Sequence, residues 1–164
     1  MFHLILSVLF ATLIGCSHTP AVTDPSRTHV IKVHDGDTIT VVSQDASQRV
    51  RLAGIDCPET DQPYGAEATE ATKSLALNRD VTVTPVTTDR YGRTVAEVNL
   101  QDGRSLTHEL VKAGACWWYR KYAPRETELE QLESEAREQR RGLWEAANPM
   151  PPWEWRKQRE TPTY

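Results

Sequence analysis

Residues 29–42, HVIKVHDGDTITVV, are the most informative segment for the fold. The β-branched runs 29–34 and 37–42 have the composition of strands, and Asp35-Gly36 between them is a strong signal for a two-residue hairpin turn. The sequence therefore predicts that the folded domain begins near residue 29 with two antiparallel strands.

Three more stretches have strand character, and three others have the apolar spacing of helices. The predicted strands are 49–55, 80–86 and 93–100, and the predicted helices are 66–77, a segment after Ser105, and 124–141. Five short strands with helices between and after them indicate an α+β domain. We expect a five-stranded OB-fold β-barrel with three packed α-helices.

The helical segments also predict which side chains face the core. The inward residues of the second helix are Leu106, Leu110 and Ala113. Gly114 is expected to end that helix. In the third helix Glu133 and Arg137 are spaced to form an ion pair, and the run of charges around them is expected to be a solvated face.

The composition suits one soluble globular domain, with 164 residues, 38% hydrophobic and 26% charged. The formal net charge of -4 lacks the excess of Lys and Arg that is typical of nucleic-acid-binding proteins. The charge counts against a nucleic-acid substrate without excluding one. The 19 Lys and Arg residues can still gather on one face, and a cation bound at an acidic site reverses the local field.

The first residues have the character of an export signal. Residues 2–15 contain no Lys, Arg, Asp or Glu, and their apolar run 4–10 is too short to span a membrane. The sequence Leu13-Ile14-Gly15-Cys16 resembles the lipobox of bacterial lipoproteins, in which the cysteine becomes the lipidated first residue. The segment departs from that pattern in offering only His3 where Lys or Arg is usual. An N-terminal core helix is the alternative.

The lipobox resemblance implies a signal peptide over 1–15, lipidation of Cys16 and a flexible tether over 16–28, which is rich in Pro, Ser and Thr. We therefore expect an exported protein that is lipid-anchored in the bacterial cell envelope or secreted. Ser17 after the cysteine, in place of Asp, favours the outer membrane if the cell has one.

Two cysteines remain in the predicted domain, Cys57 and Cys116. In an oxidising compartment they are a candidate disulfide pair. Two small buried thiols are an equally good interpretation, because the sequence does not tell whether their Cα atoms approach within bonding reach.

Three polar clusters lie where strands begin or end. The first is Asp35-Gly36-Asp37-Thr38, the second runs from Arg51 to Asp56, Glu59 and Thr60, and the third is Asp89-Arg90-Tyr91-Gly92-Arg93. Each alone has an ordinary explanation: a hairpin tip, a surface salt bridge before a capping turn, and a type I turn. Together they offer carboxylates for a hard cation and guanidinium forks for a phosphate, which are the groups that phosphodiester hydrolysis requires.

In order and spacing these clusters closely resemble the three signature blocks of the staphylococcal nuclease (thermonuclease) family. The likeness continues through residues 64–68 to Arg141-Gly142-Leu143-Trp144, so it covers 29–144. It implies an OB-fold barrel with three helices. It also implies calcium-dependent cleavage of both DNA and RNA that leaves 3′-phosphates.

The resemblance also assigns roles to individual positions. Asp37 and Asp56 match the family's metal carboxylates, and Cys57 matches a position that gives its backbone carbonyl to the metal. Asp35 matches a carboxylate that supports the site through water. The catalytic positions are Glu59, which matches the general base, and the phosphate-binding arginines Arg51 and Arg93. Oxygen ligands suit calcium or magnesium better than zinc.

Aromatic residues near the third helix match less closely. The family carries tyrosines near the bound nucleotide, so Tyr91, Tyr119 and Tyr122 are nucleotide-binding candidates, whereas Trp117 and Trp118 are expected to pack in the core. The Pro- and Trp-rich basic tail, 145–164, resembles base-stacking segments of single-strand binders in composition. We favour the simpler interpretation, a tail packed on the domain or trailing from it.

These features leave three hypotheses for the function. The first is an exported, metal-dependent endonuclease acting on DNA and RNA, expected to be a monomer without an obligate protein partner. The second keeps the fold without strong catalysis, as an OB-fold module that binds nucleic acid or a protein at the cell envelope. The third is a non-enzymatic envelope lipoprotein. The third gives no reason for Arg51, Glu59 and Arg93, and a degenerate module is expected to have lost at least one of them.

Overall fold

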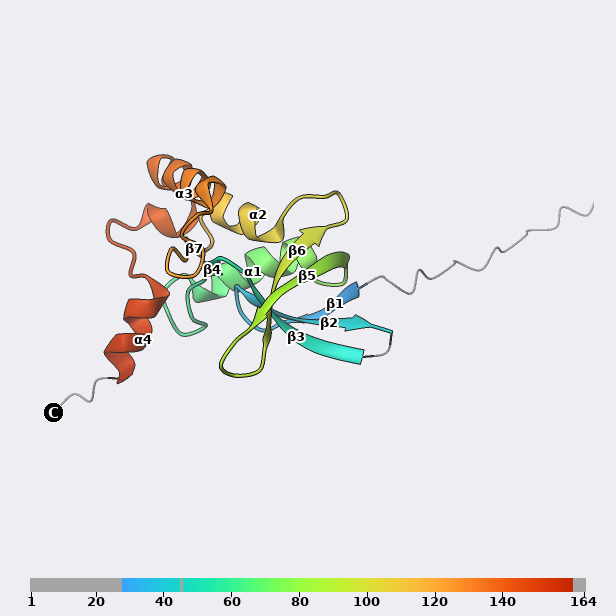
Figure 1. The fold of residues 1–164 in the computed structure, drawn as a ribbon. Helices are drawn as coiled ribbons and strands as arrows, with labels where there is room; N and C mark the ends of the chain where they lie inside the picture. The colour runs from blue at the N-terminus through green and yellow to red at the C-terminus, as the bar shows by residue number, and fades with distance from the viewer. Residues whose placement is uncertain (1–27, 45, 161–164) are drawn as a thin grey trace, which may run out of the picture.

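The computed structural model describes residues 28–44 and 46–160 (Figure 1). The predicted signal peptide, the lipidation site Cys16 and all of the predicted tether except Thr28 lie outside the described residues. In the described part, no helix is both long enough and apolar enough to span a membrane.

Five strands form a closed barrel, which confirms the predicted fold class. The strands are β1 (Thr28–Val33), β2 (Thr38–Ser43), β3 (Ala46–Leu52), β5 (Asp80–Thr88) and β6 (Thr94–Leu100). Their order around the barrel is β1-β2-β3-β6-β5, and β1 pairs with β5 to close it. All neighbours are antiparallel except β3 and β6, which run parallel. These pairings bring the beginning of β2, the end of β3 and the beginning of β6 into one region.

The turn between β1 and β2 differs from the predicted two-residue hairpin. Four residues, 34–37, separate the two strands, and the His34 N–H donates to the Thr38 carbonyl over 2.8 Å. Gly36 does not have the positive φ that a tight hairpin turn requires. Its glycine is needed for another reason: a Cβ there would lie 2.6 Å from Cβ of Cys57. A tertiary contact therefore determines this glycine.

A second, two-stranded sheet lies beside the barrel. It pairs β4 (Ile55–Asp56) with β7 (Trp117–Trp118) in antiparallel fashion. The predicted strand 49–55 was wrong at its far end, because β3 stops at Leu52 and the chain turns at Gly54, with φ 78°. The break moves Asp56 out of the barrel and places it beside Trp117.

Four α-helices and one short 3-10 helix are present in the described residues, rather than three helices. They are α1 (Gly65–Ala76), α2 (Leu106–Lys112), α3 (Thr127–Glu138), η1 (Gly142–Glu145) and α4 (Pro152–Glu160). In Figure 1, α1 and α2 lie close to the barrel, whereas α3 and α4 lie beyond it, on the left of the view. Helix α4 lies in the segment 145–164, for which we predicted a tail packed on the domain or trailing from it and no helix. Its first residue is Pro152, a position where the missing N–H costs no hydrogen bond.

The inward faces of α2 and α3 agree only in part with the expected pattern. Leu106 and Leu110 are fully buried, but Ala113 is exposed at the C-terminal cap of α2. Glu133 is 3% exposed rather than solvated. Its carboxylate accepts the Trp118 N–H at 3.2 Å and forms the expected pair with Arg137 at 3.4 Å. The glutamate thus ties α3 to β7, a contact between elements that helical spacing alone does not predict.

Candidate active site

A buried cluster of carboxylates surrounds Arg51 at the ends of the barrel strands. Arg51 in β3 pairs with Thr38 in β2, so the residue before β2, Asp37, lies beside it. The Arg51 guanidinium forms an ion pair with Asp37 and donates to Oδ1 of Asp56 over 2.8 Å. It also donates to the Ile55 carbonyl at 3.3 Å. Residues distant in the sequence therefore meet around one cation.

The two carboxylates predicted to bind a metal, Asp37 and Asp56, are almost inaccessible to solvent. Asp37 is 5% exposed and Asp56 is 1% exposed. Burial raises the pKa of Asp56, and the neighbouring Asp37 raises it further, although hydrogen bonds from Arg156 act in the opposite direction. For Arg51, burial opposes the charge, but Asp37 and Asp56 outweigh that effect and raise its pKa. The arginine is held as a cation between two anions.

Asp35 extends the cluster. Burial raises its pKa to about 6, and the negative charge of Asp37 adds to the effect. Its Oδ1 accepts the Asp37 N–H at 3.1 Å, which fixes the turn that carries both carboxylates. Three acidic side chains thus share a region that resists further negative charge, as expected for a site completed by a cation.

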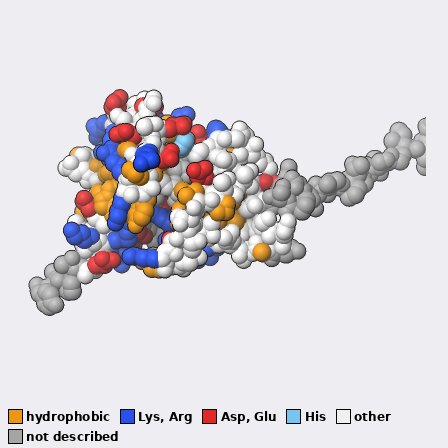
Figure 2. Space-filling model, in the orientation of Figure 1, with side chains coloured by type: hydrophobic (Ala, Val, Ile, Leu, Met, Phe, Trp, Pro, Cys, Tyr) orange, Lys and Arg blue, Asp and Glu red, His pale blue; other side chains and the backbone are white. Residues whose placement is uncertain are grey.

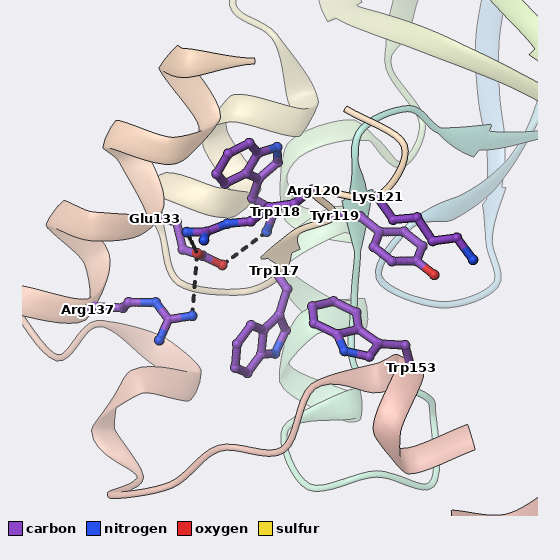
Figure 3. A pocket seen from close by; sticks show the side chains of 8 residues that line it. All are labelled: Trp117, Trp118, Tyr119, Arg120, Lys121, Glu133, Arg137 and Trp153. Atoms are coloured by element: carbon purple, nitrogen blue, oxygen red, sulfur yellow. Dashed lines mark hydrogen bonds and ion pairs between the residues drawn. The ribbon is translucent and has the colours of Figure 1, made fainter. Parts of the chain in front are cut away.

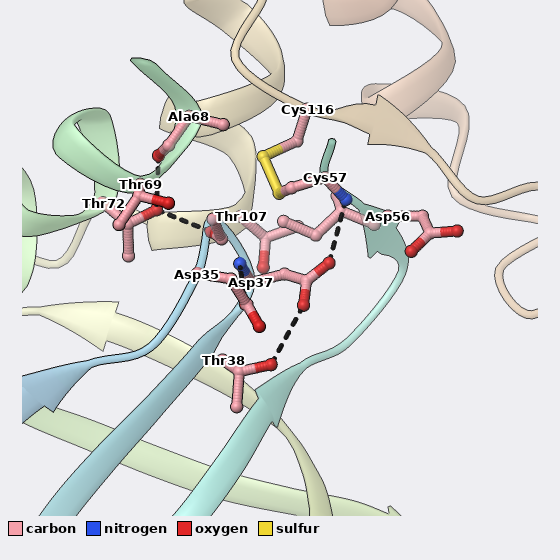
Figure 4. The surroundings of a disulfide bond; sticks show 12 residues. Asp35, Asp37, Thr38, Asp56, Cys57, Ala68, Thr69, Thr72, Thr107 and Cys116 are labelled. Carbon is pink, nitrogen blue, oxygen red and sulfur yellow. Dashed lines mark hydrogen bonds between the residues drawn. A yellow bond between two sulfur atoms is a disulfide. The ribbon is translucent and has the colours of Figure 1, made fainter. Parts of the chain in front are cut away.

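A disulfide joins Cys57 and Cys116 and closes one side of this region (Figure 4). Of the two interpretations left open by the sequence, the structure has the bonded one. The Cys57 N–H donates to Oδ2 of Asp37 at 2.8 Å, so the bridge is directly linked to a predicted metal carboxylate. Its sulfur is engaged in the bridge. Only oxygen from the main chain of Cys57 is therefore suited to a hard cation, in agreement with the role that the resemblance assigns to it.

The loop that carries Glu59 is held by glutamine and glycine contacts. Gln62 is buried, accepts the Glu59 N–H through Oε1 at 3.2 Å, and donates its own N–H to the Glu59 carbonyl at 2.9 Å. Gly65, the first residue of α1, lies against the same carbonyl, where a Cβ would stand only 1.9 Å away. The Glu59 main chain is therefore fixed although its side chain is partly exposed.

Arg156 of α4 also contacts this cluster, a contact that was not predicted from the sequence. Its guanidinium lies 2.6 Å from Oδ2 of Asp56 and 2.6 Å from Oε1 of Glu59. The basic residues of the tail had suggested phosphate contacts as the less favoured alternative. In the structure the nearest partners of Arg156 are acidic instead.

Arg93 and Tyr91 lie apart from the carboxylates. Arg93 forms an ion pair with Asp89 over 2.7 Å, and this turn is further fixed by the Tyr91 N–H, which donates to Asp89 at 2.9 Å. Tyr91 is 68% exposed, and the guanidiniums of Arg90 and Arg93 lie over its ring. Among the contacts of residues 28–44 and 46–160, none joins Arg93 to Asp37, Asp56 or Glu59. The parallel pairing of β6 with β3 nevertheless places Arg93 at the strand next to Arg51.

Of the remaining aromatic candidates, Tyr119 lines a pocket between β7, α3 and α4, whereas Tyr122 does not. The pocket has a volume of about 730 Å³, and its lining residues are Trp117, Trp118, Tyr119, Arg120, Lys121, Glu133, Arg137 and Trp153 (Figure 3). Tyr119 stacks on Trp153 of α4 with ring centroids 5.1 Å apart, and Tyr122 meets Tyr119 edge-on at 4.9 Å. Trp117 and Trp118 are buried, which confirms that they pack in the core, although both also line this pocket.

Basic side chains gather at the same end of the molecule. Figure 2 shows Lys and Arg concentrated over the region of α3 and α4, interspersed with acidic and apolar side chains. The opposite end, formed by β1, β2 and β3, carries few charges on this face. A chain with an acidic total charge therefore still presents Lys and Arg side chains at this end, mixed with acidic ones.

The resemblance predicts a divalent cation at the oxygen donors of this cluster. Within the described residues there is no group of three or more His, Cys, Asp or Glu side chains disposed to hold a metal ion. Asp37 and Asp56, supplemented by the Cys57 carbonyl, form a smaller set of hard oxygen donors, which suits calcium or magnesium. The raised pKa values of Asp35 and Asp56 indicate negative charge that a cation would relieve.

Fold and site together define a class of enzyme. Carboxylates and arginines that converge on a strand end can bind a phosphate, offset its charge and activate water, which is the chemistry of phosphodiester hydrolysis.

Known proteins agree with this class. The model of the staphylococcal nuclease homologue family matches residues 49–146, so α4 lies outside the match. A protein of Escherichia coli O157:H7 described as an uncharacterized endonuclease is 46% identical over 127 residues, covering 77% of this chain and 82% of that protein. A micrococcal nuclease of Shigella flexneri is 38% identical over 140 residues, or 80% of each chain. A staphylococcal-like nuclease of Arabidopsis thaliana is 42% identical over 109 residues, 66% of this chain and 33% of that protein.

The chain therefore belongs to the staphylococcal nuclease family. It is an endonuclease that hydrolyses the phosphodiester bonds of nucleic acids.

Proposed function

We propose that this endonuclease is calcium-dependent, cleaves both DNA and RNA, and leaves 3′-phosphates. The observation that carries the proposal is the convergence of Asp37, Asp56 and Arg51 on one buried site, with Glu59 at its edge. Outside the described residues, we further propose that the chain is exported and anchored in the cell envelope by a lipid on Cys16. We propose that it acts as a monomer.

In the proposed mechanism, Asp37, Asp56 and the Cys57 carbonyl would hold the cation. A calcium ion bound there would supply positive charge that offsets the charge of the phosphate. The Asp35 carboxylate orients Asp37 by accepting its N–H. Because Cys57 donates its own N–H to Asp37, the two ends of the donor set are coupled through one hydrogen bond.

The catalytic steps fall to Glu59 and the arginines. Glu59 accepts a proton from the attacking water, whose oxygen forms a bond to phosphorus as the bond to the 5′ oxygen breaks. Arg51 and Arg93 donate hydrogen bonds to the phosphate oxygens as negative charge develops on them. The departing 5′ oxygen takes a proton from solvent water, so the products are a 3′-phosphate and a free 5′-hydroxyl.

Metal-dependent cleavage tests the proposal. The purified chain from Ser17 onward is incubated with single-stranded and double-stranded DNA and with RNA, in calcium and then in chelator. We expect cleavage of both nucleic acids in calcium alone, with 3′-phosphate ends identified by their resistance to extension until a phosphatase removes them. Failure to cleave in any divalent cation would reject the catalytic proposal.

The metal ligands are tested separately. Asp37→Ala is expected to weaken calcium binding in a calorimetric titration without nucleic acid, because it removes one of two buried carboxylate donors. Asp61→Ala serves as a control, since Asp61 is exposed and pairs with Arg159 on α4. Equal calcium affinity for both variants would place the metal elsewhere.

One observation favours the second hypothesis, a catalytically weak module that binds nucleic acid or a protein partner. Arg156 engages both Asp56 and Glu59, which are the groups that the mechanism needs free. Nucleic-acid binding without metal-dependent cleavage would support that hypothesis.

A further inference from the structure

Arg156 and Arg51 both contact the carboxylate of Asp56. Arg51 contacts Oδ1 of Asp56 at 2.8 Å, and Arg156 contacts Oδ2 at 2.6 Å and Oδ1 at 3.2 Å. The two guanidiniums donate three hydrogen bonds to the Asp56 carboxylate and therefore compete with a metal for its oxygens. Cation binding at Asp56 is strengthened when one of the two arginines withdraws from it.

The two arginines differ in how easily they can withdraw. The Arg51 side chain is 17% exposed and is also paired with Asp37. It lies on β3, which is paired with a strand on each side. The Arg156 side chain is 39% exposed and belongs to the last helix of the described chain. Withdrawal of Arg156 requires only a change of its own rotamer or a small movement of α4. Arg156 is therefore the arginine that yields.

Helix α4 nevertheless keeps Arg156 beside the site. Trp153 stacks on Tyr119, Arg159 pairs with Asp61, and Gln62 donates to the Met150 carbonyl at 2.6 Å just before the helix begins. These contacts join α4 to the Glu59 loop and to the pocket, independently of Arg156. When the guanidinium leaves Asp56, it therefore remains at the rim of the carboxylate cluster.

A guanidinium at this rim has an obvious new partner once a nucleic-acid strand is bound. Its planar fork matches the oxygens of a phosphate as well as those of a carboxylate. A cation on Asp56 removes the negative charge that attracts Arg156 there, while the substrate supplies another negative charge close by. The same exchange applies to Arg51, whose partners in the structure are likewise carboxylates.

We propose that Arg156 is a third substrate-binding arginine of this nuclease. It pairs with Asp56 and Glu59 in the absence of the cation, and it moves to a phosphate of the DNA or RNA strand when the cation binds. This inference rests on the proposed function, because it takes the Asp37 and Asp56 site as the calcium site. It assigns a part in substrate binding to α4, which lies beyond the barrel.

The test compares Arg156→Gln with Arg159→Gln, which removes the same charge from the same helix three residues further on. In calorimetric titrations with calcium alone, Arg156→Gln is expected to bind calcium about three- to tenfold more tightly than the unaltered chain, because no guanidinium competes for Asp56. Arg159→Gln is expected to change calcium affinity much less.

The second measurement uses a fluorescent single-stranded DNA oligonucleotide with calcium present. Every protein in it also carries Arg93→Gln, so that the probe is not cleaved. Arg156→Gln is expected to weaken oligonucleotide binding about three- to tenfold and to reduce the slope of log affinity against log salt by about 0.7, the value for one lost phosphate contact on a single strand. Arg159→Gln is expected to leave that slope closer to its original value.

Two results would overturn the inference. Tighter calcium binding with unchanged oligonucleotide affinity would make Arg156 a simple cover of the site, and unchanged calcium affinity would show that its contact with Asp56 does not compete with the metal. If Arg156→Gln unfolds at a lower temperature, Arg156→Lys carries the test, since it keeps the charge and loses the fork. A further result would refute the inference and leave the proposed function standing: the unaltered chain cleaves nucleic acid in calcium, while neither Arg156→Gln nor Arg156→Lys changes calcium affinity or oligonucleotide affinity.

Discussion

Asp35, Asp37 and Asp56 illustrate how this protein holds negative charge in a place where solvation is poor. Buried carboxylates normally require a compensating partner. Arg51 compensates Asp37 and Asp56, whereas the pKa of Asp35 is raised to about 6 because burial and the neighbouring Asp37 both disfavour its ionised form. Keeping these carboxylates ionised close together therefore has an electrostatic cost, which a bound cation would reduce.

Asp35→Asn is expected to stabilise the cation-free protein above pH 6. The folded state keeps the Asp35 proton up to a pKa of about 6, whereas the unfolded chain loses it near 3.8. Stability is therefore lost as the pH rises through that window, and the amide avoids the loss while still accepting the Asp37 N–H. The gain in unfolding free energy should be on the order of 1–2 kcal/mol at pH 8 and near zero at pH 4.

Urea unfolding at both pH values measures this difference, with Asp61→Asn as an exposed control. Calcium should reverse the order of stability at pH 8, because the unaltered chain gains more from the cation than the variant does. A gain of equal size at pH 4 and pH 8 would contradict the explanation by ionisation.

Glu59→Gln is expected to lower kcat by about 10²–10⁴ with little change in KM, because a general base acts as the proton moves in the transition state. Glutamine keeps an oxygen that can accept from Arg156, so the local contacts should persist. Steady-state cleavage of a DNA oligonucleotide in calcium gives both constants. Glu67→Gln, an exposed change on the first turn of α1, is the matched control.

Arg93→Gln should act in the same direction as Glu59→Gln, since it removes a donor to the developing charge. A rise in KM at unchanged kcat for either variant would assign it to substrate binding instead of catalysis.

At the scale of elements, the Cys57–Cys116 bridge joins β4 to the segment just before β7, and 59 residues separate its ends. Gly36 packs directly on it, since even a Cβ at that position would meet the Cys57 side chain. Direct contacts therefore hold together the bridge, the turn after β1 and the Asp37 carboxylate.

Replacing both cysteines by alanine is expected to cost roughly 2–4 kcal/mol of unfolding free energy, because the bridge restricts the unfolded chain. Calcium affinity should fall as well, since Cys57 orients Asp37 through its N–H. Denaturant unfolding and calcium titration measure the two effects. Reductant should weaken the unaltered chain and leave the double variant unaffected; a chain indifferent to reductant would argue that the bridge is not formed in solution.

Helix α4 represents the limit of what local sequence patterns predict. The Pro- and Trp-rich composition of 145–164 predicted a tail packed on the domain or trailing from it, and no helix was predicted there. What stabilises it is tertiary: the stacking of Trp153 on Tyr119 and the ion pairs of Arg156 and Arg159. Such contacts leave no periodic signal in the chain.

At the scale of the whole molecule, an acidic protein acts on an acidic polymer. The formal charge of -4 includes carboxylates that are buried at the site and would be offset by a cation, while Lys and Arg collect at the end formed by α3 and α4 (Figure 2). The distribution of charge, more than its sum, governs the approach of the substrate.

Cys16→Ala is expected to move the protein from the membrane fraction to the soluble fraction of a bacterial host. The alanine cannot carry the lipid that the proposed anchor requires. Loss of the lipid's acyl chains sharply weakens membrane binding. Fractionation and incorporation of labelled fatty acid measure the change. Membrane association that survives the substitution, or absence of label in the unaltered chain, would contradict the proposed anchor.

The sequence by itself determined the barrel and most of the candidate site. β-Branched runs and helical spacing are local, so the five barrel strands and α1, α2 and α3 could be predicted within a few residues, and Asp37, Arg51, Asp56 and Glu59 followed from the resemblance of their motifs. Tertiary structure alone decided three matters: the bond between Cys57 and Cys116, the burial of Glu133, and the contact of Arg156 with Asp56 and Glu59. Each depends on residues brought together from distant parts of the chain, and pairing of that kind has no signature in the spacing of neighbours.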